Sequence, residues 1–259
     1  MLDLADRIEG RAAQLAEEAL AEMYRDPFWE ARYGERGRRF SHEDGHYHVR
    51  YLVEALRSGT PETLCAYARW LQTLLTSRGM CTAHLVENFE RIGAKVGSAV
   101  EGSEAAVAYL KAAVEALRYP EGAAREVQDA AEAMEAQVRA QVKAQEGAAD
   151  ERQAPEGIAG AGTLLSYLID AIARDRPELF GDHLLFAADY LGARGAPPAL
   201  LEGRLDAIEA SLALLPEGAP GRALAAEVVD AARGRIRQGA QGAGDARGAH
   251  DALEAARAT

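Results

Sequence analysis

Apolar side chains recur every three or four residues along most of the chain, which is the spacing of one face of an α-helix. The first such stretch covers residues 2–24, and its apolar positions include Leu4, Ile8, Leu15 and Leu20. Asp26-Pro27 ends it, since proline disfavours the helical conformation in the residue before it. The segment 27–40 that follows is rich in arginine and glycine, and we expect it to be an irregular connection.

Further helices are predicted from the same spacing and from residues that favour helix ends. We expect Ser41 to be an N-cap, with Glu43 and Asp44 in the first turn, where the helix dipole favours negative charge. Pro61 suits the first turn of the next helix. The predicted helices cover residues 41–57, 61–78, 81–98, 103–118 and 120–146. The segment 147–157, GAADERQAPEG, breaks the pattern and predicts a linker.

The chain also repeats itself at an offset of 116 residues. Identical pairs at this offset include Tyr51 and Tyr167, Pro61 and Pro177, Arg78-Gly79 and Arg194-Gly195, and Glu101-Gly102 and Glu217-Gly218. A shared proline at a helix start and a shared Arg-Gly at a helix end are harder to obtain by chance than shared leucines. We interpret this as a tandem duplication, with repeat 1 over residues 1–119, repeat 2 over 120–238 and a flexible tail over 239–259.

Composition and charge narrow the class of protein. The chain is 48% apolar but only 6% aromatic, which favours closely packed helices. Its net charge of −12 argues against a general binder of nucleic-acid backbones. No apolar run reaches the roughly 18 to 20 residues that span a bilayer. The start of the chain lacks signal-peptide features, and Cys65 and Cys81 lack metal or disulfide spacing. We expect an all-α cytoplasmic protein without nucleic-acid or membrane partners.

Comparison of the two repeats identifies a polar set that only the first repeat carries. Residues of this set and their counterparts are Asp44 and Gly160, His46 and Gly162, His48 and Leu164, Arg50 and Ser166, and His84 and Leu200. Because the second repeat keeps the apolar positions without these groups, the fold does not require them, and a functional role gains weight. Because leucine replaces His48 and His84, we expect both imidazoles to face inward, where each needs a partner or a ligand.

One motif within this set suggests a metal. Residues 42–46, HEDGH, match the HExxH pattern of zinc proteases, with His42 and His46 on one helical face. The motif lies at a predicted helix start and no strand precedes it, so we do not expect a protease. A zinc or iron site in a helical bundle, with His48 or His84 as a further ligand, is an alternative. A di-iron bundle would need a second carboxylate-histidine pair.

The other polar and aromatic candidates have two interpretations each. The arginines of the connection, Arg32, Arg36, Arg38 and Arg39, fit either a solvated loop or a clamp for carboxylates or phosphates. The aromatic side chains Tyr67, Trp70 and Phe89 fit either the core or a platform for a ligand.

The stretch YGERGRRFSHEDGHYHVRYLVEALRSGTP, residues 33–61, resembles the chromophore region of phycobiliproteins, which are globin-like light-harvesting subunits. Their motif is Cys-x-Arg-Asp, followed by an aromatic pair, an apolar residue and Arg. On this pattern Asp44 takes the place of the Asp that hydrogen-bonds the pyrrole nitrogens, Tyr47 and His48 that of the aromatic pair, and Arg50 that of the Arg. The order of the following helices is also similar, so the resemblance covers residues 33–118.

Two departures from the family pattern change what it implies. Ser41 stands where the bilin-bearing Cys would be, so a thioether link is excluded at that site. Glu43 stands where the motif has Arg, a partner of a propionate, for which the upstream Arg36, Arg38 and Arg39 could substitute. The resemblance therefore implies a bilin held without a covalent bond.

We thus predict two tandem globin-like or phycobiliprotein-like domains that form an intramolecular pseudo-dimer. The predicted function is a non-enzymatic tetrapyrrole-binding sensor or carrier, with a biliverdin-like bilin in the first repeat and haem or a corrinoid as alternatives. Candidate ligand-binding residues are Asp44, Tyr47, His48, Arg50, Arg36, Arg38, Arg39, Trp70 and His84. The alternative functions are a ligand-free helical interaction scaffold and the zinc or iron bundle on His42 and His46. A homo-oligomer is left open.

Overall fold

The protein is all-α, as the sequence predicts. The computed structural model describes residues 1–146 and 155–257, with side chains described over 1–145 and 155–238. Within these ranges the regular elements are helices, and no strand occurs. The predicted linker at 147–157 lies mostly outside the described residues.

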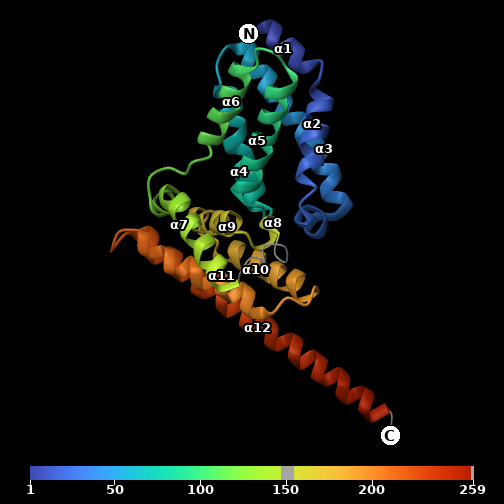
Figure 1. The fold of residues 1–259 in the computed structure, drawn as a ribbon, viewed down its shortest axis with the longest axis vertical. Helices are drawn as coiled ribbons and strands as arrows, with labels where there is room; N and C mark the ends of the chain where they lie inside the picture. The colour runs from blue at the N-terminus through green and yellow to red at the C-terminus, as the bar shows by residue number, and fades with distance from the viewer. Residues whose placement is uncertain (147–154, 258–259) are drawn as a thin grey trace.

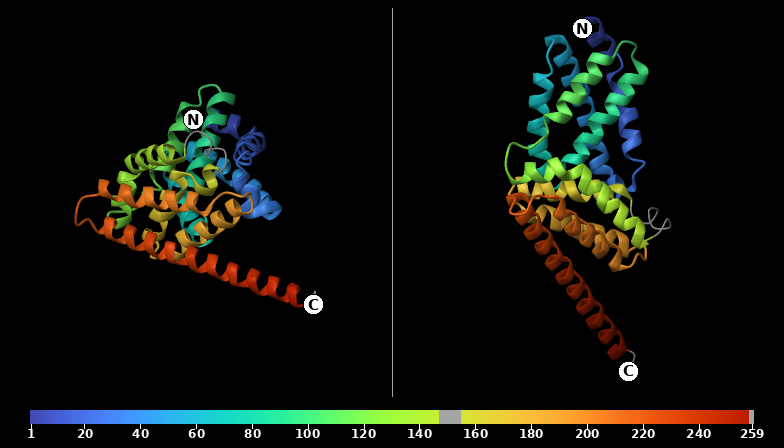
Figure 2. Two further views of the ribbon diagram at one scale, coloured as in Figure 1. Left: turned by 60° about the horizontal axis from the view of Figure 1, so that its bottom comes forward. Right: turned by 60° about the vertical axis from the view of Figure 1, so that its left-hand side comes forward.

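The first half is a bundle of helices, and one end of this bundle packs against the second half (Figures 1 and 2). Its helices are α1 (Leu2–Glu9), α2 (Ala12–Met23), α3 (Pro27–Ser58), α4 (Glu62–Ser77), α5 (Thr82–Ala99) and α6 (Glu104–Glu115). Helix α2 packs against α3 and α5, and α6 against α4 and α5. The buried face of α3 follows the predicted spacing, with Val49, Leu52, Val53 and Leu56 inside. The bundle encloses its own apolar core.

The second half is also built of packed helices. Its helices are α7 (Ala123–Glu146), α8 (Glu156–Ala159), α9 (Ala161–Ala173), α10 (Pro177–Gly192), α11 (Pro198–Ser211) and α12 (Pro220–Arg257), with the 3-10 helix η1 (Leu212–Leu214). Helix α7 packs against α9 and α11, as α2 packs against α3 and α5. Helix α12 runs to Arg257, through the segment that we expected to be a flexible tail.

The beginning of α3 differs from the sequence prediction. Residues 27–40 are helical, not an irregular connection, and Ser41 lies inside the helix instead of capping it. Pro27 does stop the preceding helix, but it also occupies the first turn of α3, where a missing N–H costs nothing. The Asp26 carboxylate caps this turn by accepting a hydrogen bond from Phe28 N at 2.8 Å. The sequence prediction missed that Phe28 and Trp29 are buried and thereby hold the segment in place.

Two helical stretches are interrupted near a glycine. Gly34 has a left-handed φ of 55° and kinks α3, a conformation that costs glycine little. The predicted helix over 2–24 is divided near Gly10 into α1 and α2. At Gly10 the apolar spacing continues across the break, so periodicity gives no sign of it.

Several local features of the backbone and side chains recur in the two halves. They are separated by 116 residues, the same offset that relates the two sequences. Backbone positions with a left-handed φ form three such pairs: Gly59 (76°) and Asp175 (50°), Gly79 (83°) and Gly195 (76°), and Gly102 (67°) and Gly218 (80°). The first residues of α5 and α11, Thr82 and Pro198, have the same offset. The rings of Tyr51 and Tyr67 stack with centroids 3.9 Å apart, and so do their counterparts Tyr167 and His183.

The halves meet where the start of α5 packs on α9. The buried Asp170 carboxylate accepts hydrogen bonds from Thr82 N at 2.6 Å, Thr82 Oγ1 at 2.7 Å and Tyr119 Oη at 2.6 Å. Ser166 Oγ accepts a hydrogen bond from Ala83 N at 2.9 Å. Burial raises the pKa of Asp170 to about 6, although its three donors favour the ionised form. This contact fixes the start of α5 against the second half.

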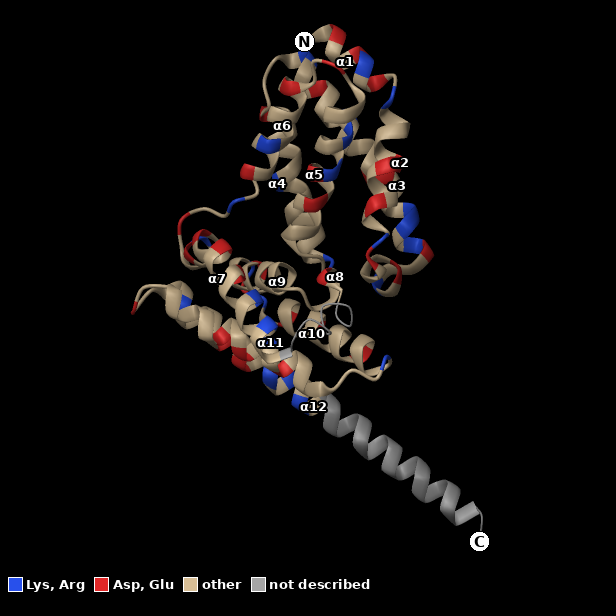
Figure 3. Cartoon of the chain, viewed as in Figure 1, with Lys and Arg blue, Asp and Glu red and all other residues tan. Residues whose placement is uncertain are grey.

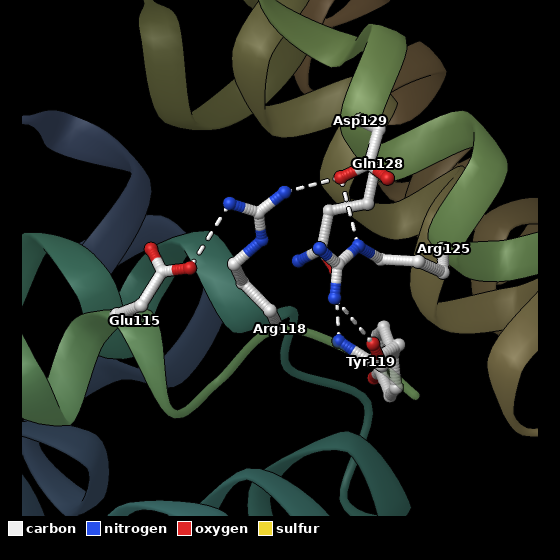
Figure 4. Close-up of polar contacts among 6 residues, drawn as sticks. All are labelled: Glu115, Arg118, Tyr119, Arg125, Gln128 and Asp129. Carbon is white, nitrogen blue, oxygen red and sulfur yellow. Dashed lines mark hydrogen bonds and ion pairs between the residues drawn. The ribbon is translucent and has the colours of Figure 1, made fainter. Parts of the chain in front are cut away.

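A second junction is the link between α6 and α7, where the predicted boundary at residues 119 and 120 falls. Arg118 bridges Glu115 on α6, at 3.0 Å, and Asp129 on α7, which also pairs with Arg125 at 2.8 Å (Figure 4). The side chain of Gln128 accepts a hydrogen bond from Tyr119 N at 2.8 Å. These contacts are exposed for the most part, so their role is to orient the link and not to supply much stability.

The apolar core of the second half extends into the first. It includes Met23, Phe28, Trp29 and Cys81, which lie before residue 119. The rings of Phe28 and Phe186 are 6.0 Å apart in an edge contact, and the guanidinium of Arg32 lies 4.7 Å from the centre of the Phe186 ring. The start of α3 thus belongs to both halves.

No helix in the described part of the chain is long and apolar enough to cross a membrane. Basic and acidic residues are intermingled over the helices in the view of Figure 3.

Candidate functional site

A cavity of about 550 Å³ lies in the first half, at the end that faces the second half. Its walls come from the end of α2, the kinked part of α3, the end of α4 and the start of α5. Residues that line it are Met23, Trp29, Tyr33, Arg36, Gly37, Phe40, Ser41, Asp44, His48, Leu75, Arg78, Met80, His84, Leu85 and Asn88. This volume lies in the range of small-molecule and cofactor sites, about 300 to 1,000 Å³.

Helical spacing explains why α3 supplies so much of the wall. Gly37, Ser41, Asp44 and His48 follow one another at three or four residues and share one face of the helix. On α5, His84 and Asn88 are one turn apart and point to the same side. Gly45 lets α3 approach α2 closely, because a Cβ there would lie 3.3 Å from the Cβ of Ala16.

The cavity has a buried end and an exposed end. His48 and His84 are buried, whereas Arg36, Phe40 and Arg78 are exposed, so the cavity opens to solvent on the arginine side. Within the described residues, neither Arg36 nor Arg78 forms an ion pair within 4.0 Å. Two cations without close anionic partners at the mouth of an apolar cavity suit a ligand that carries carboxylates.

His84 is the most unusual group in the wall. Its side chain is 4% exposed, and no described residue forms a hydrogen bond with either ring nitrogen. Its ring lies 4.8 Å from that of Phe28 and 4.9 Å from that of Trp29, with Tyr167 of the second half at 5.8 Å. Burial, with a smaller effect of the positive charge of Arg32, lowers the pKa of His84 to about 3. The imidazole is therefore neutral at neutral pH.

His48 is buried but has a partner. Its Nδ1 lies 2.8 Å from Tyr67 Oη, and its ring lies 5.1 Å from that of Phe89. Burial lowers the pKa of His48 to about 3, so this imidazole is also neutral. Which of the two groups donates the proton decides whether Nε2 of His48 is a donor or an acceptor.

Asp44 is the acid in the wall. Burial raises its pKa, and the positive charge of Arg78 partly offsets this effect. A carboxylate that is partly removed from water next to neutral imidazoles and a cation can accept hydrogen bonds from N–H groups of a ligand.

The structure thus brings together four of the nine residues predicted to bind the ligand, namely Arg36, Asp44, His48 and His84. Five lie outside the cavity wall. Tyr47 and Trp70 are 50% and 60% exposed, and Trp70 stacks on Tyr67. Arg50 pairs with Glu54 at 3.2 Å. Arg38 pairs with Glu30 at 3.0 Å, and the guanidinium of Arg39 lies 5.3 Å from the centre of the Phe40 ring.

Sequence reasoning missed several residues of the wall, among them Trp29, Tyr33, Arg78, Met80 and Asn88. The first two were assigned to a connection, so helical spacing was not applied to them. Two of the others carried a signal in the comparison of the repeats. Met80 and Asn88 correspond to Ala196 and Arg204, so the halves differ there as they do at His84.

In the second half the polar wall residues have mostly apolar or glycine counterparts. These are Gly157 for Ser41, Gly160 for Asp44, Leu164 for His48 and Leu200 for His84, with Arg204 for Asn88. Ile158 and Ala159 of helix α8 are fully buried. The carbonyl of Ile158 accepts a hydrogen bond from His183 Nε2 at 2.9 Å, and Arg204 is bonded to the carbonyl of Ala159. A Cβ at Gly157 would collide with Phe28, which enters from the first half.

The metal alternative on His42 and His46 has a less complete set of ligands. The two rings are 4.7 Å apart, and His42 Nε2 lies 3.6 Å from Glu17 Oε1 on α2. In the described part of the chain, no three His, Cys, Asp or Glu side chains are grouped so that they could hold a metal ion. A metal there would have to draw most of its ligands from water.

Comparison with protein-family models, with curated proteins and with solved structures gives no match for this chain.

Proposed function

We propose that this protein binds a tetrapyrrole, without a covalent bond, in the cavity of its first half, and that it acts as a sensor or carrier and not as an enzyme. The observation that carries the proposal is the difference between the halves. The polar side chains Asp44, His48 and His84 line a cavity in one half, and the other half has Gly160, Leu164 and Leu200 at the corresponding positions. The fold does not need these polar side chains, yet in the first half they surround a cavity.

The chemistry of the wall supports the ligand class. Trp29, Tyr33, Phe40 and the two methionines offer apolar and aromatic surface for a flat ring system. Arg36 and Arg78 at the exposed end would pair with its carboxylates, and Asp44 would accept hydrogen bonds from pyrrole N–H groups. A bilin, which has several pyrrole N–H groups and two propionates, fits this donor and acceptor set.

Together with this function we propose an architecture. It is a tandem duplication of phycobiliprotein-like or globin-like domains, arranged as an intramolecular pseudo-dimer. The three pairs of left-handed residues and the repeated ring stack support a duplication, because turns and stacks at one fixed offset do not follow from helicity alone. In this proposal the second half has a structural role, since it lacks the polar side chains of the first-half wall.

The test is a titration of the purified full-length protein with biliverdin and, separately, with haemin. We expect a saturable band that is shifted from that of the free pigment, with a stoichiometry of one per chain. Asp44→Leu should weaken binding, whereas Glu54→Gln, at a half-buried position that is outside the cavity, should not. Pigment that stays free at all protein concentrations, or binding that is equal in Asp44→Leu, would overturn the proposal.

A further inference from the structure

The imidazole of His84 has no structural partner in the described part of the protein. Both of its nitrogens are buried without a hydrogen bond, although a neutral imidazole offers one donor and one acceptor. A buried polar group without a partner lowers stability, and its counterpart Leu200 shows that the fold accepts an apolar side chain at this position. A histidine at position 84 therefore lowers the stability of the protein, and the fold does not require a histidine there.

The surroundings of His84 are aromatic toward α3 and the second half. Its ring is in contact with those of Phe28, Trp29 and Tyr167. The positive charge of Arg32 on α3 lowers the pKa of His84, and His84 in turn affects the pKa of His183 on α10, but neither residue is hydrogen-bonded to its ring nitrogens. His84 also lines the cavity. The cavity is therefore where we expect a partner of His84 to lie.

We infer that His84 contacts the core of the bound ligand directly, through a nitrogen lone pair, and so selects ligands whose centre offers an acceptor of that pair. This inference rests on the function proposed above and assigns the part of the ligand that each end of the cavity recognises. The arginine end receives the acidic groups, and the buried end receives the ring centre.

Two kinds of centre offer this chemistry within the tetrapyrrole class. One is a pyrrole N–H, which donates a hydrogen bond to the imidazole. The other is a metal ion that brings its remaining ligands with it in a macrocycle. A bare metal ion does not fit, because no group of three His, Cys, Asp or Glu side chains in the described residues could hold it.

His84 differs from the two other buried histidines, because each of those has a hydrogen-bond partner. His48 is bonded to Tyr67, and His183 is bonded to the carbonyl of Ile158. Replacing either one leaves a former partner unpaired, so both changes should lower stability. His84→Leu leaves no partner behind and should raise it.

The experiment measures urea unfolding of the ligand-free protein and pigment binding for wild type, His84→Leu and the control His183→Leu. We expect His84→Leu to unfold at a higher urea concentration than wild type and to bind at least tenfold more weakly. His183→Leu should unfold at a lower urea concentration and keep the wild-type affinity. Biliverdin and haemin, titrated separately, distinguish the N–H centre from the metal centre.

A second variant tests whether His84→Leu loses binding only because the leucine changes the packing of the cavity wall. His84→Ala leaves room for free imidazole, whose addition should restore the band of the bound pigment. Wild-type protein that binds neither pigment would overturn the proposed function and this inference with it. Wild-type protein that binds, with equal affinity in His84→Leu or a lower urea midpoint for that variant, would overturn the role of His84 alone.

Discussion

The carboxylate of Asp170 accepts a hydrogen bond from the backbone N–H of Thr82, with Asp170 Oδ2 2.6 Å from Thr82 N. This bond joins α9 of the second half to the first turn of α5, the helix that also carries His84 into the cavity wall. The position of the cavity wall is therefore set partly by a residue of the second half.

Asp170→Ala should destabilise the protein by about 3 kcal/mol, because it leaves the N–H and hydroxyl of Thr82 and the hydroxyl of Tyr119 buried without an acceptor. Urea unfolding measures the change. Asp182→Ala is the matched control, since Asp182 is exposed and forms an ion pair with Arg235, and it should cost about 0.5 kcal/mol or less. Equal losses for the two variants would contradict the assigned role of Asp170.

The buried histidines predict that acid destabilises the protein. His84 has a folded-state pKa of about 3, well below its ordinary value of 6.5, so the unfolded chain takes up a proton as the pH falls below about 6.5 and the folded protein does not. Each pH unit below about 6.5, down to about 3, therefore lowers the free energy of unfolding of the wild-type protein. The gap in unfolding free energy between His84→Leu and wild type should therefore widen by about 1.4 kcal/mol per pH unit below pH 6.5.

The control for this pH dependence is a second histidine of the same kind. Burial also lowers the pKa of His183 to about 3. The difference in unfolding free energy between His183→Leu and wild type should therefore change with pH by the same amount per unit, although His183→Leu is the less stable protein at neutral pH. Asp170, whose pKa is raised, acts with the opposite sign but is present in all three proteins and cancels. Parallel profiles for wild type and His84→Leu between pH 4 and 6.5 would show that His84 is protonated in the folded state.

The exposed end of the cavity predicts recognition of carboxylates. Arg78→Ala should weaken pigment binding about tenfold by removing a charge-assisted hydrogen bond, and the loss should shrink when the pigment is supplied as its dimethyl ester. Arg50→Ala is the control, because Arg50 pairs with Glu54 outside the cavity. An equal loss in both variants would indicate a general effect of net charge.

The close approach of α2 and α3 predicts a cost for a larger side chain at Gly45. Gly45→Val should destabilise the protein by about 1 to 3 kcal/mol, since a Cβ alone would lie 3.3 Å from the Ala16 Cβ. Gly234 in α12 has no atom within 4 Å of such a Cβ, so Gly234→Ala should stabilise the helix by up to about 1 kcal/mol. Thermal unfolding of both variants makes the comparison.

Much of the fold could be predicted because helix formation depends on local spacing. Helices α4, α5 and α6 lie close to their predicted ranges, since prolines, glycines and apolar stripes mark their ends within the sequence itself. The comparison of the two repeats also singled out Asp44, His48 and His84, which meet in one cavity. A leucine at the matching place is a local sign that a histidine faces inward.

What the sequence determined by itself is the helical class, the internal repeat and the identity of an inward polar set. Tertiary structure alone decided that residues 27–40 are helical, because Phe28 and Trp29 are held by a core that belongs mainly to the second half. It also decided which polar residues meet: Arg78 and Asn88 join His84, while Tyr47 and Trp70 face outward. The physical reason is that a cavity is bounded by side chains from several helices, and no local spacing records how distant helices are rotated toward one another.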